Sequence, residues 1–132
     1  PNVESGGRNM SDVHIDWGAA VGTTTTQDPS MTSPVTYLDC SKYAKARIRM
    51  IASAPTATEA TGQFFWSTTE HGVGEERSVS FKVQLDGKWR DYELDLKSNP
   101  NWKGLTDRLR LDPVNLAGVE ISVDEIRLIK SN

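Results

Sequence analysis

Apolar and polar residues alternate one by one in five separate segments of this 132-residue chain. A period of two places side chains of one kind on one face of a β-strand. Turn-forming residues stand between the segments, and no stretch of useful length has a helical period. Several short strands separated by turns predict an all-β fold, a two-sheet antiparallel β-sandwich. The five segments are residues 46–52, 79–85, 92–96, 109–111 and 119–123.

The same alternation predicts which side chains form the core. Asp86-Gly87 lies between two strand-like runs and indicates a β-hairpin. Asp124-Glu125 places two polar residues in a row within the final strand, which predicts a β-bulge. Trp102 is expected to close one end of the core. The predicted core residues are Ile48, Phe81, Val83, Leu94, Leu109, Leu111, Ile121 and Val123.

Length and charge limit the classes of function. The chain suits a single domain over residues 1–132, and its first residue, Pro1, leads us to expect a module excised from a larger multidomain protein. A net charge of -3 gives no general attraction to nucleic acid or to an anionic membrane. No apolar run is long enough to span a bilayer. The lone Cys40 excludes an intrachain disulfide and a cysteine-based metal site. We expect the domain to be a monomer.

Residues 38–129 carry a resemblance to a known family, in the segments LDCSKYAKARIRM, FFWSTTE, VSFKVQLDGKWRDYELDL, WKGLTDRLRLDP and VEISVDEIRLI. These segments resemble the jelly-roll carbohydrate-binding modules of bacterial polysaccharide-degrading enzymes. The resemblance implies a jelly-roll sandwich that binds polysaccharide without catalysis and keeps an attached catalytic domain near its substrate. It also implies a secreted or cell-surface location in bacteria. It does not specify the sugar, because a fold does not fix a function.

Aromatic side chains are the first candidates for sugar contacts, since sugar rings stack on flat apolar surfaces. Trp66 belongs to a strand that is apolar on both faces, so it points either into the core or toward a ligand. Trp89 shares a face with acidic residues and either binds sugar or packs within the hairpin. Trp17 borders a Gly- and Thr-rich loop. We predict that Trp17, Trp66 and Trp89 contact the glycan.

Arginine residues are the second candidates, because guanidinium groups bind carboxylate or sulfate through two hydrogen bonds. Arg47 and Arg49 lie on one strand, and Arg108 and Arg110 on another. If the two strands are neighbours in one sheet, they form a basic platform for an anionic polysaccharide; an anionic or galactan-type ligand is then expected. The alternative is a solvated face on which the arginines pair with acidic residues. Arg47, Arg49 and Arg110 are the predicted sugar-binding cations.

The family resemblance also suggests a structural calcium ion near the chain termini. Calcium takes six to eight oxygen ligands. Asp124 at the bulge is the first candidate, with Glu4 or Asp12 from the N-terminal segment; the alternative is an Asp124 that only caps the bulge.

Catalysis has little support in the sequence. His14 and His71 are far apart, and no nucleophile motif, phosphate loop or metal-spaced histidine cluster is present. We therefore predict a non-enzymatic binding module, with a spacer domain without ligand as the alternative and a small polysaccharide lyase as the minor one.

Overall fold

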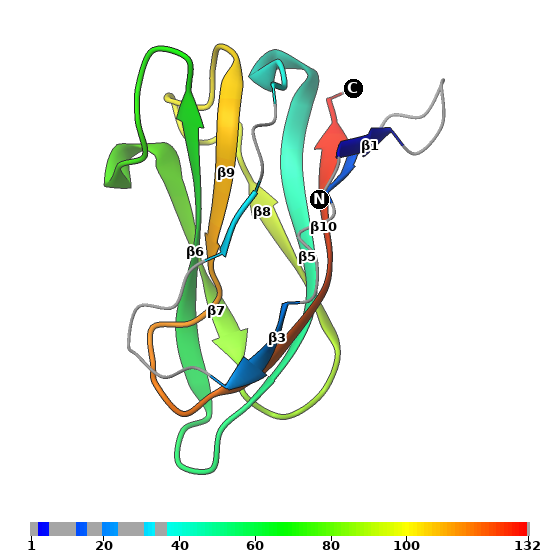
Figure 1. The fold of residues 1–132 in the computed structure, drawn as a ribbon, viewed down its shortest axis with the longest axis vertical. Coiled ribbons are helices and arrows are strands. Elements are labelled where there is room, and N and C mark those ends of the chain that lie inside the picture. Colours follow the sequence, from blue (N-terminus) through cyan, green and yellow to red (C-terminus); the bar gives the residue numbers. More distant parts are fainter. Residues whose placement is uncertain (1–2, 6–12, 16–19, 24–30, 34–36, 132) are drawn as a thin grey trace.

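The computed structural model describes the backbone of residues 3–5, 13–15 and 20–23, and both backbone and side chains of residues 31–33 and 37–131. Its elements are β1 (Val3–Ser5), β2 (Val13–Ile15), β3 (Ala20–Thr23), β4 (Met31–Thr32), η1 (Cys40–Lys42), β5 (Tyr43–Ser53), β6 (Glu59–Thr68), η2 (Glu75–Arg77), β7 (Ser78–Gln84), β8 (Arg90–Asp95), β9 (Thr106–Asp112) and β10 (Glu120–Lys130), where η marks a short 3-10 helix. The predicted all-β sandwich is confirmed (Figure 1).

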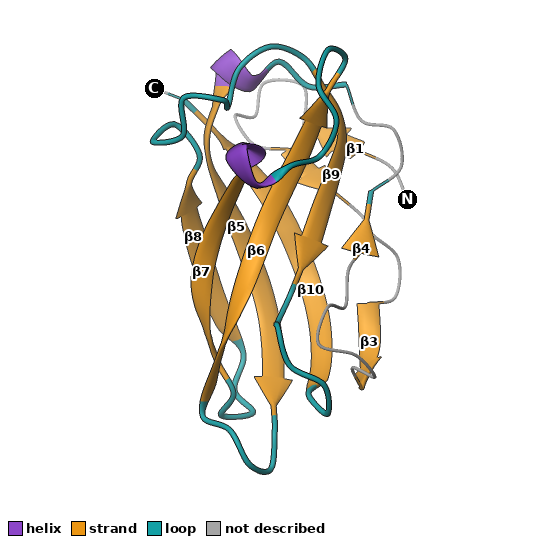
Figure 2. Ribbon diagram, turned by 90° about the vertical axis from the view of Figure 1, so that its left-hand side faces the viewer, coloured by secondary structure: helices purple, strands orange, loops and turns teal. Residues whose placement is uncertain are grey.

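Two antiparallel sheets pack face to face, as Figure 2 shows. Sheet A has the order β1–β2–β10–β5–β8, and β3 pairs with the other half of β10. Sheet B has the order β4–β9–β6–β7. The chain crosses between the sheets after β3, β4, β5, β7, β8 and β9, which gives the jelly-roll arrangement. Within the described residues, no helix is long and apolar enough to cross a membrane.

The core lies between the sheets and follows the alternation of the strands. Residues 46, 48, 50 and 52 of β5 point inward, and their neighbours in the chain point outward. Of the eight predicted core residues, six are buried, while Phe81 and Val123 are half-buried and pack against the cluster. The predicted bulge is also present, as a register shift between Val123 and Glu125 where β10 pairs with β5.

One end of the core is closed by Trp102, as predicted. Its indole packs edge-on against Trp66, with ring centroids 5.0 Å apart and an interplanar angle of 85°. Its Nε1 donates a hydrogen bond of 2.8 Å to the carbonyl of Tyr43. Both aromatic side chains therefore bury their rings and still satisfy their polar groups.

The predicted Asp86-Gly87 hairpin is wrong, because β7 and β8 belong to different sheets. Gly87 adopts a φ of 70°, and its N–H donates to the carbonyl of Ala52 at 2.9 Å. Asp86 bridges to Ser53 at the end of β5. The turn therefore pairs with β5 and carries the chain across the sandwich. The rings of Phe81 in β7 and Tyr92 in β8 pack against each other between the two sheets, with centroids 5.4 Å apart.

Candidate functional site

A pocket of about 360 Å³ opens at the end of the sandwich where β6 ends. This end pocket is lined by residues 68–71 after β6, by Arg77 of η2, and by Asn101 and residues 103–105 from the loop between β8 and β9. Its volume lies within the range of small-molecule sites in proteins. It is the first candidate for a ligand site because it joins concavity with polar side chains.

The first wall of the end pocket is a tight turn held by Thr68. The Thr68 hydroxyl oxygen accepts hydrogen bonds from the backbone N–H of His71 at 3.1 Å and of Glu70 at 3.3 Å. The Thr68 N–H donates to the carbonyl of His71 at 2.8 Å. The next residue, Thr69, donates its N–H to the carbonyl of Leu105 at 3.1 Å, which ties this wall to the opposite loop. These bonds fix the backbone that carries the exposed side chains.

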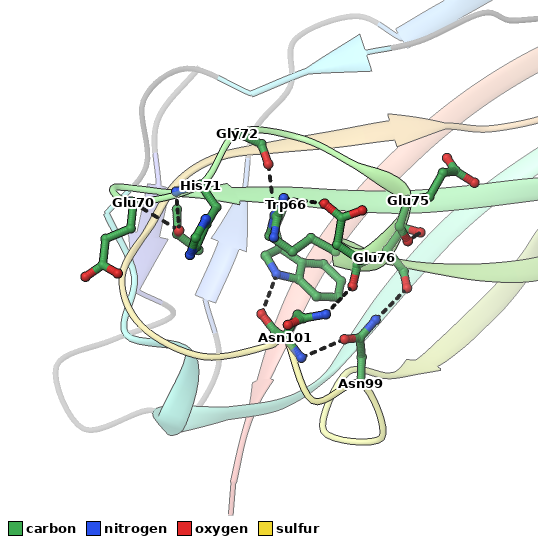
Figure 3. Close-up of polar contacts among 11 residues, drawn as sticks. Trp66, Glu70, His71, Gly72, Glu75, Glu76, Asn99 and Asn101 are labelled. Carbon is green, nitrogen blue, oxygen red and sulfur yellow. Dashed lines mark hydrogen bonds and ion pairs between the residues drawn. The ribbon is translucent and has the colours of Figure 1, made fainter.

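The second wall is organised by Asn101 (Figure 3). Its amide nitrogen donates to the carbonyl of Glu76 at 2.9 Å, and its backbone N–H donates to the Asn99 side chain at 2.8 Å. The carbonyl of Asn101 accepts the Trp66 Nε1–H at 3.0 Å. Arg77 donates through Nε to the carbonyl of Gly72 at 2.9 Å and pairs with the carboxylate of Glu76. The wall is thus preorganised by bonds that do not involve a ligand.

The open side of the end pocket combines hydrogen-bonding groups with an apolar rim. Glu70, His71 and Lys103 are exposed there and offer a carboxylate, an imidazole and an ammonium group. The side chain of Leu105, which is 42% exposed, lines the pocket as well. Such a lining offers both donors and acceptors beside an apolar surface.

Tyr37 is a further exposed aromatic side chain and was not predicted as a binding residue. Asp39 pairs with Leu105 across an antiparallel bridge, and Tyr37 precedes Asp39 by two residues, outside the described strands. Tyr37 is 63% exposed. No periodic pattern surrounds it in the sequence, so only the bridge between Asp39 and Leu105 indicates its place.

The prediction that Trp66 faces a ligand is wrong, because its side chain is fully buried in the core. The outward aromatic residue of β6 is Phe65, which is 5% exposed and lies under the Arg110 guanidinium at 5.1 Å from the ring centroid. Three consecutive aromatic residues hide the phase of the alternation, and the pairing of Trp66 with the buried Leu109 sets it.

The predicted basic platform does not form, because β5 and β9 lie in different sheets. Arg47 and Arg49 therefore face outward from sheet A, whereas Arg110 faces outward from sheet B. Arg49 and Arg110 pair with carboxylates instead. Arg110 binds Asp112 through two bonds of 2.7 and 3.0 Å, and Arg49 lies 3.5 Å from Asp91. For Arg49 and Arg110 the structure therefore supports the alternative of a solvated, ion-paired face.

Trp89 is exposed, as predicted, and lies in the turn before β8 at the end of the sandwich opposite to the end pocket. The Arg49 guanidinium lies over its ring, 5.4 Å from the ring centroid, in a cation–π contact. Its contact with a sugar stays a prediction. Trp17, the remaining predicted aromatic, lies outside the described residues.

The described residues contain no cluster of acidic side chains of the kind that holds calcium. Among them, no three His, Cys, Asp or Glu side chains gather closely enough to hold a metal. Asp124 lies 3.7 Å from the Arg49 guanidinium, so its described neighbour is a cation. The side chain of Glu4 and all of Asp12 lie outside the described part, and calcium binding stays a prediction. Melting with and without EDTA tests it, because an ion that binds only the folded state raises the melting temperature.

No family model and no curated protein matches this sequence. Solved structures do. A family 86 xylan-binding module from Roseburia intestinalis aligns at 6% identity and a TM-score of 0.52, over 91% of this chain and 94% of that module. A variant of a family 29 carbohydrate-binding module aligns at 9% identity and a TM-score of 0.53, over 96% and 89%.

A larger protein matches as well. A family 43 arabinoxylan arabinofuranohydrolase from Bacillus subtilis, solved with cellotetraose, aligns at 8% identity and a TM-score of 0.56 over 96% of this chain. The chain spans only 23% of that hydrolase. At such identities the likeness establishes the fold: this chain has the two-sheet sandwich of carbohydrate-binding modules.

Proposed function

We propose that this domain binds a neutral polysaccharide, without cleaving it, at the end pocket. The observation that carries the proposal is the pocket itself: a preorganised frame that presents Glu70, His71 and Lys103 beside the apolar Leu105. A sugar ring offers C–H faces and hydroxyl groups that both donate and accept, so it matches apolar contact combined with mixed polar groups. The sandwich fold shared with carbohydrate-binding modules supports this assignment.

The charges around the end pocket favour a neutral ligand. Arg77 is paired with Glu76, and the remaining charged side chains of the lining, Glu70 and Lys103, have opposite signs. A carboxylate or sulfate would meet Glu70 without a surplus of cations to offset it. Arg49 and Arg110, on the outer faces of the two sheets, are each paired with a carboxylate and are not available to an anionic ligand without breaking that pair. Neutral sugar hydroxyls, in contrast, use the carboxylate as an acceptor and the ammonium as a donor.

The lining of the end pocket favours binding over catalysis. Glycoside hydrolysis usually takes two carboxylates, one on each side of the scissile bond. Glu70 is the one carboxylate among the residues that line this pocket. The lining also contains no tyrosine that could act with His71 in the proton abstraction of a lyase. We therefore assign the domain a targeting role, in which it holds an attached, extracellular polysaccharide-degrading enzyme near its substrate. The likeness to a segment of an arabinofuranohydrolase supports this role.

The test is affinity gel electrophoresis on arabinoxylan, mixed-linkage β-glucan and β-1,4-galactan, with polygalacturonate as the anionic comparison. We expect retardation in at least one neutral gel, at an affinity on the order of micromolar to millimolar. The double variant His71→Ala, Lys103→Ala should lose retardation, whereas the control Lys97→Ala, exposed outside the pocket, should keep it.

Two other outcomes contradict the proposal. A wild type that no gel retards supports the spacer alternative. New reducing ends or unsaturated products in the same incubations support an enzyme.

A further inference from the structure

Trp89 stands on a turn whose backbone is fixed. The carboxylate of Asp86 accepts the N–H of Lys88 at 3.2 Å and pairs with the Arg90 guanidinium. Gly87 is tied to the end of β5 through its bond to Ala52. The indole is 44% exposed in spite of this anchoring. A rigid, exposed indole loses little conformational entropy when a ligand stacks on it.

The surroundings of Trp89 combine apolar and polar groups in the way a sugar requires. Continuing the β5–β8 register by one residue beyond the Met50–Arg90 pair places Ile51, which also faces outward, opposite Trp89. Arg49 lies over the indole and is itself held by Asp91 at 3.5 Å and Asp124 at 3.7 Å. The Trp89 patch consists of Trp89, Ile51, Arg49, Asp91 and Asp124, and it combines two apolar side chains with a guanidinium group that is paired with carboxylates.

The Trp89 patch lies far from the end pocket. Leu85, just before the turn, donates its N–H to the carbonyl of Thr58 at the start of β6, whereas the pocket begins at Thr68 where β6 ends. The ten residues of β6 span roughly 30 Å at the usual rise of a strand. Figure 1 shows the turn before β8 and the end of β6 at opposite ends of the sandwich. One sugar unit therefore cannot contact both.

We propose that the Trp89 patch is a second binding site for neutral polysaccharide, so that one domain holds two chain segments at once and cross-links the polymer. This inference rests on the proposed function of the end pocket. The patch suits the same ligand class, because its one guanidinium group, that of Arg49, is already paired with Asp91 and Asp124, while Trp89 is still 44% exposed and offers an apolar contact. Two weak sites on one rigid domain raise the apparent affinity for a polymer well above that of either site.

The experiment compares the wild type, Trp89→Ala, Trp89→Tyr, the control Lys88→Ala and the pocket variant His71→Ala, Lys103→Ala. Each is titrated with the neutral polysaccharide that retards the wild type most and with a hexasaccharide cut from it, while light scattering follows cross-linking. We expect two hexasaccharides per wild-type domain and one for Trp89→Ala. Trp89→Ala should lose about tenfold or more in apparent affinity for the polymer and should not raise its scattering. Trp89→Tyr should restore part of both, and Lys88→Ala should match the wild type.

The outcomes separate the two proposals. If Trp89→Ala binds and cross-links as the wild type does, the second site is wrong, while binding in the end pocket stands. If Trp89→Ala alone abolishes binding and the pocket variant binds normally, the end pocket is wrong and the patch is the single site. A wild type that binds no neutral polysaccharide contradicts both. Equal melting temperatures of all variants establish that the folds are intact.

Discussion

The indole Nε1 of Trp66 donates a hydrogen bond of 3.0 Å to the backbone carbonyl of Asn101 and so connects the core to the wall of the end pocket. Trp66 packs against Trp102 inside the sandwich, while Asn101 lines the pocket outside it. The residue that the sequence suggested as a sugar contact thus supports the site from beneath. Its replacement should affect stability first and binding only through the position of the wall.

Trp66→Ala should lower the free energy of unfolding by roughly 3–5 kcal/mol, because it leaves a large cavity in the core. Trp66→Phe should cost less, since it keeps most of the apolar contact but leaves the Asn101 carbonyl without its donor, at about 1–3 kcal/mol. Urea denaturation measures both. The exposed Trp89→Phe serves as a control and should change the midpoint little. If Trp66→Ala is as stable as the wild type, the core assignment is wrong.

Cys40 should be inert in the folded protein. Its side chain is fully buried, and burial raises the pKa of the thiol to about 12. Since the thiolate is the reactive form, a thiol-specific reagent at neutral pH should label the domain only after denaturant is added. Rapid labelling of the native protein would mean that the segment around η1 opens readily.

Asp86 should make stability depend on pH in the acid range. Hydrogen bonds and charge from Arg90 hold the pKa of the Asp86 carboxyl below its ordinary value. The stabilisation is therefore present above the pKa of an unfolded aspartate, near about 3.9, and is lost as the pH falls through the lower folded value. Melting temperatures of the wild type and Asp86→Asn should differ near neutral pH and converge in acid. A difference that grows in acid contradicts the pairing.

Added salt should leave polysaccharide binding unchanged. Arg49 and Arg110 are each paired with a carboxylate, and they point from opposite sheets, so these two arginines do not form a joint basic surface. Screening weakens the attraction of a charged ligand but not the stacking of a neutral one. Titrations at low and high sodium chloride concentration check this expectation. A steep loss of affinity with salt, together with a similar loss in Arg47→Ala and Arg49→Ala, would contradict the neutral ligand and indicate an anionic polysaccharide.

The strands and the core were predictable because a period of two marks both the strand and its inward face. The six fully buried core residues that were predicted, Ile48 and Leu109 among them, follow directly from it. The phase of Phe64 to Trp66 was not predictable, since an unbroken apolar run has no alternation. Only the neighbours of β6 in sheet B decide which aromatic ring points inward.

The site was less predictable than the core, because it depends on which strands share a sheet. Spacing along the chain does not reveal that β7 and β8 lie in different sheets, nor that Arg47 and Arg110 face opposite ways. The end pocket joins residues 68–71 with residues 103–105, which are more than thirty positions apart in the chain. No local pattern in the sequence indicates such a pocket, because its two walls meet only in the fold, where the Thr69 N–H donates to the carbonyl of Leu105.

The most direct test of the account is a titration of the ¹⁵N-labelled domain, followed by NMR, with a hexasaccharide of the polysaccharide that retards it. Binding in the end pocket predicts that the amide signals of Thr69, His71 and Leu105 move together with one saturation curve. Signals of Gln63 and Ser80, on the outer face of sheet B, should stay in place. Shifts confined to Gln63, Ser80 and Arg110, with the pocket amides unmoved, would contradict the account and place the sugar on the face of sheet B.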